Sequence, residues 1–217
     1  ELPKNIIVTD ENRLSLLPTF ARSKAVVIPN VPRTHKYPAP EPDRNTLTLC
    51  YFGTLAQERG SLFVRGLLDA SERVECIAAG WVSDDYTTEL CSHPRVRFLG
   101  SKPQAEVNEI LARQGDYLIA IYPINNDNNR NASPNKIFDA LHTKTPVIIS
   151  DGVVAAELVE DKGWGILINS EIALNYSQIV EELNARKNDF VFLDQDILAH
   201  TWETVKFQNT SPCGAPS

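Results

Sequence analysis

The chain has 217 residues, of which 42% are hydrophobic and 23% charged, and its formal net charge is −7. These values are typical of a soluble globular protein with one well-filled domain and room for part of a second. The acidic balance argues against general nucleic-acid binding and against an anionic membrane surface, although a local basic pocket stays open. No run approaches the roughly 20 apolar residues of a membrane helix, and no signal peptide is visible.

Cysteine and histidine usage gives no sign of a metal centre. The four cysteines show no CxxC or Cys/His metal spacing; they are Cys50, Cys76, Cys91 and Cys213. Cys50 and Cys76 fall in apolar, strand-like runs, which indicates reduced core thiols and a cytoplasmic protein. The four histidines are dispersed along the chain. The chain begins at Glu1 and contains no Met, so we expect a piece of a longer protein.

Short apolar runs alternate with amphipathic segments. Strands are predicted over 5–9 and 25–29 around a helix over 11–20, and a linker rich in proline and charge over 33–45. Further strands are predicted over 46–52, 73–79, 96–99, 117–122, 146–150 and 165–168. The helices between and after them are predicted over 61–71, 83–91, 104–113, 134–142, 153–160 and 177–186. This order predicts an α/β fold, a Rossmann-like parallel sheet with helices on both faces. A polar tail over 208–217 is expected to be flexible.

Ligands of such sheets bind beyond the carboxyl ends of the strands. Ser133 is a good N-cap and Pro134 suits the first helical position, so free amides and the helix dipole there form an anion site. Lys136 in the first turn opposes the dipole unless an anion neutralises both, which indicates a phosphate-bearing ligand. The alternative is a surface lysine on an ordinary capped helix.

Three other strand ends carry suitable chemistry. Gly53 lets the backbone approach a ligand, and Arg59 before the next helix can fork onto a phosphate. The glycine fingerprint and the Walker loop are both absent, so a dinucleotide-binding or flavodoxin-like domain is disfavoured, and a plain turn is the alternative here. Gly80 ends a strand and could face a ligand. For Trp81, the next residue, a packing role is at least as consistent with the sequence as a ligand contact. Backbone groups at Gly100 could hydrogen-bond a base edge, or form a simple turn.

These pieces in this order resemble the carboxy-terminal, donor-binding half of GT-B glycosyltransferases, specifically the group-one, retaining family of nucleotide-sugar enzymes. The resemblance runs from Val27 to Ile168. The segments that carry it are Val27 to Asn30, Gly53 to Gly60, Cys76 to Gly80, Val96 to Gly100, Asp116 to Pro123, Asn131 to Asp139, and Thr145 to Ile149. It implies that 1–32 are the remnant of the amino-terminal GT-B domain, 33–45 the linker, and 46–207 the donor-binding domain.

The resemblance also implies a role for individual positions. Arg59 matches the lysine that binds the donor diphosphate, Gly53 matches the loop glycine under the phosphates, and Thr54 stands where many members have a second arginine. The helix start would add phosphate contacts from Ser133, Asn135 and Lys136, as in polysaccharide-assembly members. The nucleobase turn matches Phe98, Leu99 and Gly100. Asp139 matches the carboxylate that binds the ribose hydroxyls, a role suited to its acceptor oxygens. Asn131 takes the position of the carboxylate that touches the donor sugar.

The implied reaction is transfer of a hexose from a nucleotide diphosphate sugar to an acceptor hydroxyl, in polysaccharide or glycoconjugate assembly. The implied enzyme is independent of metals and has no cofactor, since the nucleotide sugar is a substrate. Its partners would be the donor and its own amino-terminal domain, with no nucleic acid and no membrane-spanning segment; peripheral membrane contact through the missing half stays open. The fragment alone is expected to be inactive. A GT-B-type sugar epimerase and a non-catalytic nucleotide-sugar-binding module are the alternatives.

Overall fold

A computed structural model describes residues 6–41, 45–132, 135–169 and 173–208 of the chain. The chain divides into two compact units, Lys36–Phe192 and a smaller one formed by Glu1–His35 together with Leu193–Ser217. The domain boundaries expected after residues 32, 45 and 207 stay predictions. The division into two units falls after His35 and after Phe192. Residues 209–217 of the expected flexible tail lie outside the described residues.

The larger unit contains a six-stranded, fully parallel sheet with the strand order β5-β4-β3-β6-β7-β8. Its strands are β3 (Leu47–Leu55), β4 (Val74–Val82), β5 (Val96–Phe98), β6 (Tyr117–Ala120), β7 (Val147–Ser150) and β8 (Gly165–Ile168). Most residues of these strands are buried on both sides of the sheet, as expected where helices cover both faces. The structure therefore confirms the predicted α/β class and the parallel sheet.

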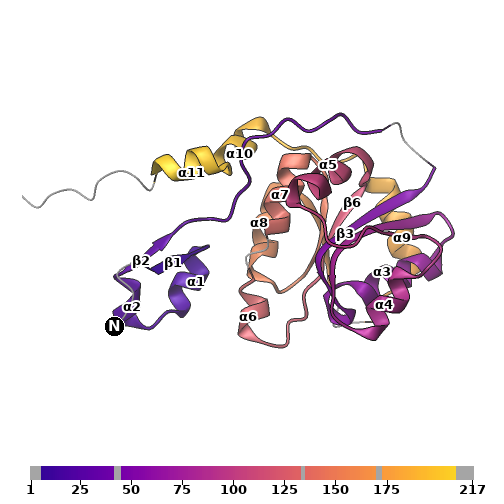
Figure 1. The fold of residues 1–217 in the computed structure, drawn as a ribbon, viewed down its shortest axis with the longest axis horizontal. Coiled ribbons are helices and arrows are strands. Elements are labelled where there is room, and N and C mark those ends of the chain that lie inside the picture. The colour runs from indigo at the N-terminus through magenta and orange to yellow at the C-terminus, as the bar shows by residue number, and fades with distance from the viewer. Residues whose placement is uncertain (1–5, 42–44, 133–134, 170–172, 209–217) are drawn as a thin grey trace, which may run out of the picture. The chain divides into compact units, whose positions relative to one another are not determined.

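Helices cover the two faces of the sheet in separate groups, which Figure 1 shows on either side of β3 and β6. One group is α3 (Ser61–Ala70), α4 (Asp85–Cys91) and α9 (Tyr176–Arg186), in which α3 contacts both of the others. The other group is α5 (Gln104–Gln114), α7 (Asn135–Thr143) and α8 (Val154–Lys162), in which α5 packs against α7. The tyrosine hydroxyl of Tyr117 donates to the carbonyl of Leu183 at 3.0 Å and ties the sheet to α9.

The strand order reverses direction between β3 and β6, which are neighbours in the middle of the sheet. From β3 the chain moves outward through β4 to β5, and from β6 it moves outward the other way through β7 to β8. The crossing connections therefore leave a crevice at the carboxyl ends of β3 and β6, and ligands of open α/β sheets bind at such a switch point.

The smaller unit is built from short elements. Strands β1 (Ile6–Val8) and β2 (Ala25–Val27) pair in parallel around α1 (Glu11–Leu16) and α2 (Thr19–Arg22), and the unit also contains α10 (Asp194–Ala199) and α11 (Trp202–Gln208). The backbone amide of Trp202 donates to the carbonyl of Pro32 at 2.8 Å, and the Glu203 carboxylate accepts from Thr34 at 3.1 Å. The carboxy-terminal segment thus packs beside residues 31–34.

Strands β3 and β4 continue to Leu55 and Val82, past the predicted ends at 52 and 79. Three further local expectations needed correction. The helix expected over 11–20 is divided into α1 and α2, because Pro18 cannot donate a helical hydrogen bond. Strand β6 ends at Ala120, two residues earlier than expected, because the amide of Tyr122 donates to the Ser150 hydroxyl instead of a strand carbonyl. The polar stretch expected as a loop contains the short helix α6 (Asp127–Arg130), which the Asn126 side chain caps.

Candidate functional site

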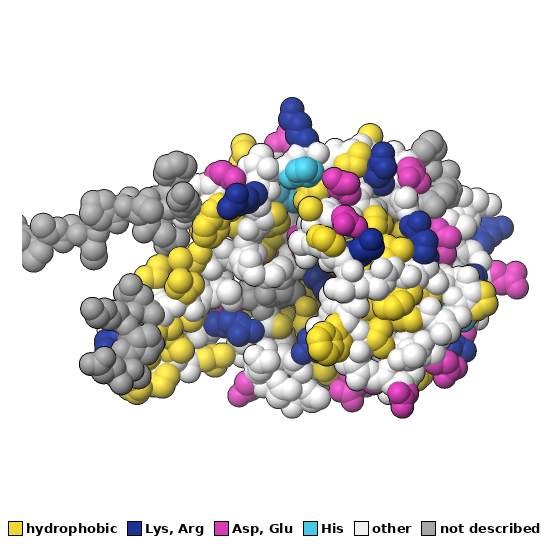
Figure 2. Space-filling model, in the orientation of Figure 1, with side chains coloured by type: hydrophobic (Ala, Val, Ile, Leu, Met, Phe, Trp, Pro, Cys, Tyr) yellow, Lys and Arg dark blue, Asp and Glu magenta, His cyan; other side chains and the backbone are white. Residues whose placement is uncertain are grey.

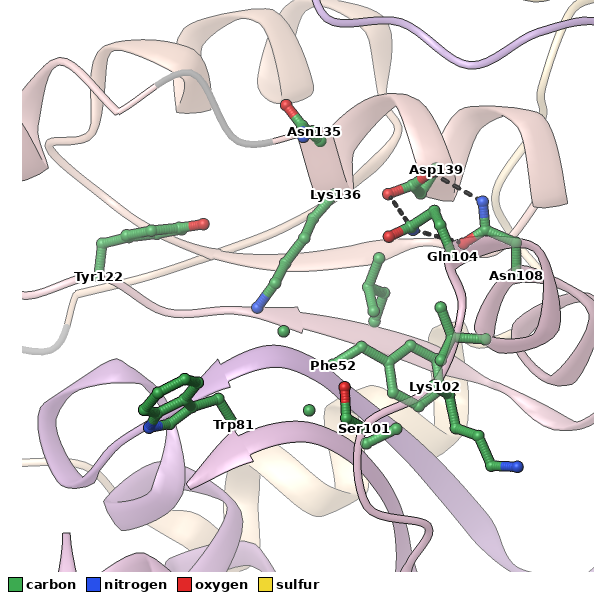
Figure 3. A pocket seen from close by; sticks show the side chains of 15 residues that line it. Phe52, Trp81, Ser101, Lys102, Gln104, Asn108, Tyr122, Asn135, Lys136 and Asp139 are labelled. Atoms are coloured by element: carbon green, nitrogen blue, oxygen red, sulfur yellow. Dashed lines mark hydrogen bonds between the residues drawn. The ribbon is translucent and has the colours of Figure 1, made fainter. Parts of the chain in front are cut away.

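A cavity of about 490 Å³ opens at the switch point, beyond the carboxyl ends of β3, β4 and β6. Its floor is formed by residues of these strands: Phe52, Gly53, Ala79, Gly80 and Leu118. Its walls come from α5, α7 and the segments that follow β4, β5 and β6: Trp81, Ser101, Lys102, Gln104, Val107, Asn108, Tyr122, Asn135, Lys136 and Asp139. Figure 3 shows the polar side chains of α5 and α7 on one side and Trp81 with Tyr122 toward the other.

The floor depends on two glycines at the paired ends of β3 and β4. Gly53 and Gly80 are register partners with φ of 98° and 139°, a region that side-chain-bearing residues rarely adopt. A Cβ on Gly80 would lie 1.9 Å from the carbonyl oxygen of Gly53, which leaves no space for any side chain. The absence of side chains at this point gives the cavity a backbone floor that a ligand can approach closely.

Lys136 extends from the first turn of α7 into the cavity floor. Its Nζ donates to the carbonyl of Ile119 at 3.1 Å and lies 5.7 Å from the centre of the Tyr51 ring. Burial, with the neighbouring charge of Arg59, lowers the pKa of Lys136 to about 8. An ammonium has three N–H donors, and within the described part of the chain only this one hydrogen bond is found. A buried cation in this state is stabilised by a bound anion.

Arg59 supplies a second positive charge beside the cavity. Its guanidinium lies 5.5 Å from the centre of the Tyr122 ring and donates to the side-chain oxygen of Asn129 at 3.1 Å. Tyr122 lines the cavity itself, whereas Arg59 lines an adjoining hollow of about 390 Å³ that also includes Asn129. Two cations that repel each other across a cavity edge favour a multivalent anion between them.

Asp139 lies one turn after Lys136 on the same side of α7 and is only 6% exposed. Its two oxygens accept hydrogen bonds from α5: Oδ1 from Asn108 at 2.8 Å and Oδ2 from Gln104 at 2.9 Å. Burial raises the pKa of the Asp139 carboxyl, against these hydrogen bonds and the charge of Lys136. The carboxylate is therefore held in place by amides rather than by an ion pair.

The structure brings together five of the residues that the sequence singled out. They line one cavity, with Arg59 in contact with its Tyr122 wall, and they are Gly53, Gly80, Asn135, Lys136 and Asp139. The helix α7 begins at Asn135, and the expected cap residues Ser133 and Pro134 lie outside the described residues.

The other sequence candidates lie near the cavity without lining it. Thr54 is exposed at the end of β3, and Asn131 follows α6, where its amide donates to the carbonyl of Asp127 at 2.8 Å. In the expected nucleobase turn, Phe98 is exposed, the amide of Leu99 donates to Ala78, and the carbonyl of Gly100 accepts from Gly80. The residues directly after this turn, Ser101 and Lys102, line the cavity instead.

The sequence interpretation missed several wall residues. Trp81 is 75% exposed at the cavity edge, so the packing alternative for this residue is wrong. Gln104 and Asn108 were not singled out, although they stand four residues apart on α5 and Asn108 is buried. Asn108 stands at helical spacing among the apolar positions Val107 and Leu111, and a polar residue on that face is the sequence signal that could have identified this wall.

Over residues 6–41, 45–132, 135–169 and 173–208, no group of three or more His, Cys, Asp or Glu side chains could hold a metal ion. Within the same ranges, no helix is both long enough and apolar enough to cross a membrane.

No protein-family model matches this sequence, and no curated protein is significantly similar to it. Solved structures do resemble it in fold. HepE of Anabaena in complex with UDP-glucose aligns with a TM-score of 0.66 at 16% identity, over 94% of this chain and 62% of that one. The lipopolysaccharide outer core galactosyltransferase WaaB aligns with a TM-score of 0.59 at 15% identity, over 95% of this chain and 62% of that one. The sucrose-phosphate synthase of Thermosynechococcus elongatus gives 0.66 at 15% identity, over 94% and 56%.

The chain has the GT-B glycosyltransferase fold. This likeness confirms the predicted fold, a Rossmann-like sheet of the GT-B carboxy-terminal half. The chain spans less than two thirds of the length of these GT-B structures. In the GT-B fold, the cavity described above lies at the switch point of this sheet, which is the place where a ligand binds in open α/β sheets.

Proposed function

We propose that this chain is the donor-binding half of a metal-independent glycosyltransferase that transfers a hexose from a nucleotide diphosphate sugar to an acceptor hydroxyl. The observation that carries the proposal is Lys136, a buried ammonium at the floor of the switch-point cavity, with Arg59 close enough to lower its pKa. A diphosphate bound there would neutralise both charges. HepE, which has this fold, was solved with UDP-glucose.

The proposed site runs along the cavity. The diphosphate lies over Gly53 with Lys136 and Arg59, and Asn135 at the start of α7 adds a donor. Ser133, which lies outside the described residues, is proposed as a further phosphate contact. Thr54 lies beside this loop in the position of the family's second arginine. The ribose lies at the Asp139 end, the base toward the turn formed by Phe98, Leu99 and Gly100, and the sugar toward Asn131.

In the proposed reaction, the positive charges of the site stabilise the leaving group. The bond between the sugar anomeric carbon and the diphosphate oxygen breaks, the acceptor oxygen bonds to that carbon, and the acceptor proton passes to a base. Negative charge grows on the leaving nucleoside diphosphate as the bond breaks. Fixed cations and helix amides in a site that excludes water stabilise such charge, and this is the largest single contribution in many enzymes.

Catalysis is proposed to need an amino-terminal domain that supplies the acceptor site and the base. The smaller unit carries apolar side chains that are exposed here, namely Ile7, Leu16, Phe20 and Val26, and Figure 2 shows hydrophobic groups gathered on it. We propose that residues 1–32 belong to that domain, so the chain alone binds donor and does not transfer sugar. Cys76 and Cys91 form no disulfide, and reduced thiols are usual in the cytoplasm. We propose a cytoplasmic place for the protein, in polysaccharide or glycoconjugate assembly.

Titration calorimetry of the chain with UDP, GDP, ADP and dTDP, with and without EDTA, tests the proposal. We expect one nucleotide to bind without added metal, and Arg59→Ala and Lys136→Ala to weaken it at least tenfold each. Binding of none of the four, or both variants equal to the parent, would overturn the proposal.

A non-catalytic binding module and a GT-B-type epimerase are the second candidates. Asn131 favours them, because an uncharged amide that donates to Asp127 replaces the carboxylate expected near the sugar. The complete protein incubated with a nucleotide sugar distinguishes them: transfer to an acceptor supports the first proposal, an epimerised sugar without acceptor supports an epimerase, and an unchanged bound sugar supports a binding module.

A further inference from the structure

An acid–amide cluster forms the wall of the cavity where α5 meets α7. It consists of Asp139, Asn108 and Gln104 (Figure 3), and Tyr37 joins it through a hydrogen bond with Asn108. The side-chain amide of Gln104 donates to Asp139 at 2.9 Å and to the Asn108 oxygen at 3.0 Å. That of Asn108 donates to Asp139 at 2.8 Å and to the Tyr37 hydroxyl at 3.3 Å.

This arrangement fixes which way each amide points. A primary amide has two N–H donors, and all the N–H donors of Gln104 and Asn108 are used within the cluster. Rotating the Gln104 amide by half a turn would place its oxygen against the Asp139 carboxylate and the Asn108 oxygen, which are both acceptors. The ionised carboxylate, which can only accept, therefore sets the orientation of both amides.

The consequence is a single acceptor aimed at the ligand. Figure 3 shows the side-chain oxygen of Gln104 directed into the cavity, on the side that faces Lys136. Among the described residues no hydrogen bond to this oxygen is found, whereas both oxygens of Asp139 already accept one. Gln104 is exposed and Asp139 is 6% exposed, so the glutamine is the group that a ligand meets first.

Resting on the proposed function, we infer that Gln104 is the side chain that accepts a hydrogen bond from the ribose hydroxyls of the donor, and that Asp139 is a positioning residue that acts through it. The substrate class this selects is a ribonucleotide diphosphate with its hydroxyls intact. A nucleotide places its ribose between the phosphates and the base, and Figure 3 shows Gln104 beside Asp139, with the Lys136 ammonium further along the cavity.

The test compares two ligands on each variant: the nucleoside diphosphate that binds the parent best, and its 2′,3′-dideoxy analogue. The measured quantity is the ratio of their dissociation constants. Any loss of folded protein changes both constants together, so each variant is its own control for folding. We expect the parent to prefer the hydroxylated ligand about tenfold, the change expected for one lost hydrogen bond to a polar group in the site.

Gln104→Met keeps the length of the side chain without the acceptor, and we expect its ratio to fall below about twofold. Asp139→Asn can donate as well as accept, so it removes the constraint on the amides, and its ratio is expected to fall in the same way. Gln178→Met, an exposed glutamine at the start of α9, is the matched control and should keep the ratio of the parent.

Three results would overturn the inference while nucleotide binding itself persists. They are a parent that binds both ligands equally, Gln104→Met with the ratio of the parent, and Asp139→Asn with an unchanged ratio, which would remove its positioning role. If Gln104 contacts the base instead of the ribose, Gln104→Met weakens both ligands equally and therefore keeps the ratio of the parent. If no nucleoside diphosphate binds the parent at all, the proposed function fails instead.

Discussion

Lys136 reaches across the end of β3 to Gly53: its Cε lies 3.6 Å from the position that a Cβ on Gly53 would take. The lysine starts on α7 and ends at the carboxyl end of β3, so the positive charge there is supplied by a distant part of the chain. For Thr54, the next residue of β3, the resemblance implied a position where many members have an arginine. The geometry of Lys136 offers a replacement for that charge.

Replacing Lys136 by Met is expected to stabilise the ligand-free chain while weakening ligand binding. The lysine is half-buried, and desolvation of its ammonium lowers its pKa to about 8, so its charged form is less favourable in the folded state than in the unfolded state. We expect the free energy of unfolding in urea at pH 7 to rise by about 1–3 kcal/mol. Affinity for the nucleoside diphosphate is expected to fall at least about tenfold.

Lys102→Met is the control for this change. Lys102 also lines the cavity, but it is exposed, pairs with Glu106 at 3.1 Å and points away from Lys136 (Figure 3). Its effect on the free energy of unfolding should stay within about 0.5 kcal/mol. A Lys136→Met variant that is less stable than the parent would contradict the account of the buried charge.

The affinity for a nucleoside diphosphate is expected to fall as the pH rises through about 8, the pKa of Lys136. The neutral amine loses its attraction for the diphosphate, whose own last ionisation, near a pKa of about 6, is complete by then. The other groups that face Lys136 are Arg59, Asp139, Tyr51 and Tyr122. Burial raises the pKa of both tyrosines above 10.0, so neither titrates in this window. Calorimetry between pH 7 and 9 in buffers of different ionisation enthalpy would detect the proton taken up on binding.

The same group gives the ligand-free chain the opposite dependence. The folded pKa of Lys136 lies near 8, below its ordinary value of 10.5, so between these values the unfolded chain binds the additional proton. Stability contributed by this group therefore rises with pH across that window and is lowest below it. Urea unfolding at pH 7.5 and 9.5 should show a gain that is absent in Lys136→Met; an equal gain in both would assign it to other groups.

Gly80→Ala is expected to disrupt the sheet end and the cavity. The new Cβ would lie 1.9 Å from the Gly53 carbonyl oxygen, and φ at this position is 139°. We expect a loss of more than about 3 kcal/mol in the free energy of unfolding, or insoluble protein. Gly100→Ala separates the effect of the contact from that of the backbone angle. Gly100 also has a positive φ, of 67°, but among the described residues no atom beyond its two chain neighbours lies within 4 Å of its Cβ position. Its cost should be near the roughly 1–2 kcal/mol of a left-handed residue alone.

Trp81→Ala is expected to lower ligand affinity without lowering stability. The side chain is 75% exposed and lines the cavity, so its removal leaves no hole in the core. The unfolding free energy should change by less than about 0.5 kcal/mol, while affinity for the nucleotide sugar falls several-fold. Trp164→Ala is the contrast: this indole is fully buried, and its loss should cost about 3–5 kcal/mol. Unchanged affinity in Trp81→Ala would remove Trp81 from the site.

Much of the fold could be predicted because its signals are local. Strand β8 was expected at its observed bounds, and α5 within one residue, since apolar runs and helical periodicity depend on neighbouring residues. The glycines at 53 and 80 and the helix start before Lys136 were visible for the same reason. The early end of β6 and the helix α6 were not predicted, because contacts of Ser150 and Asn126 with the backbone decide them.

The sequence by itself determined the class of fold, the strand ends that carry ligand chemistry and the presence of a basic helix start. Only the tertiary structure decided which of these residues share one cavity, because strand order and helix packing join segments far apart in the chain. In the tertiary structure the Trp81 side chain is exposed to solvent, and Gln104 and Asn108 of α5 lie against Asp139 of α7. Hydrogen bonds between residues more than 30 positions apart leave no periodicity in a sequence, and they are what orients the acceptor in this wall.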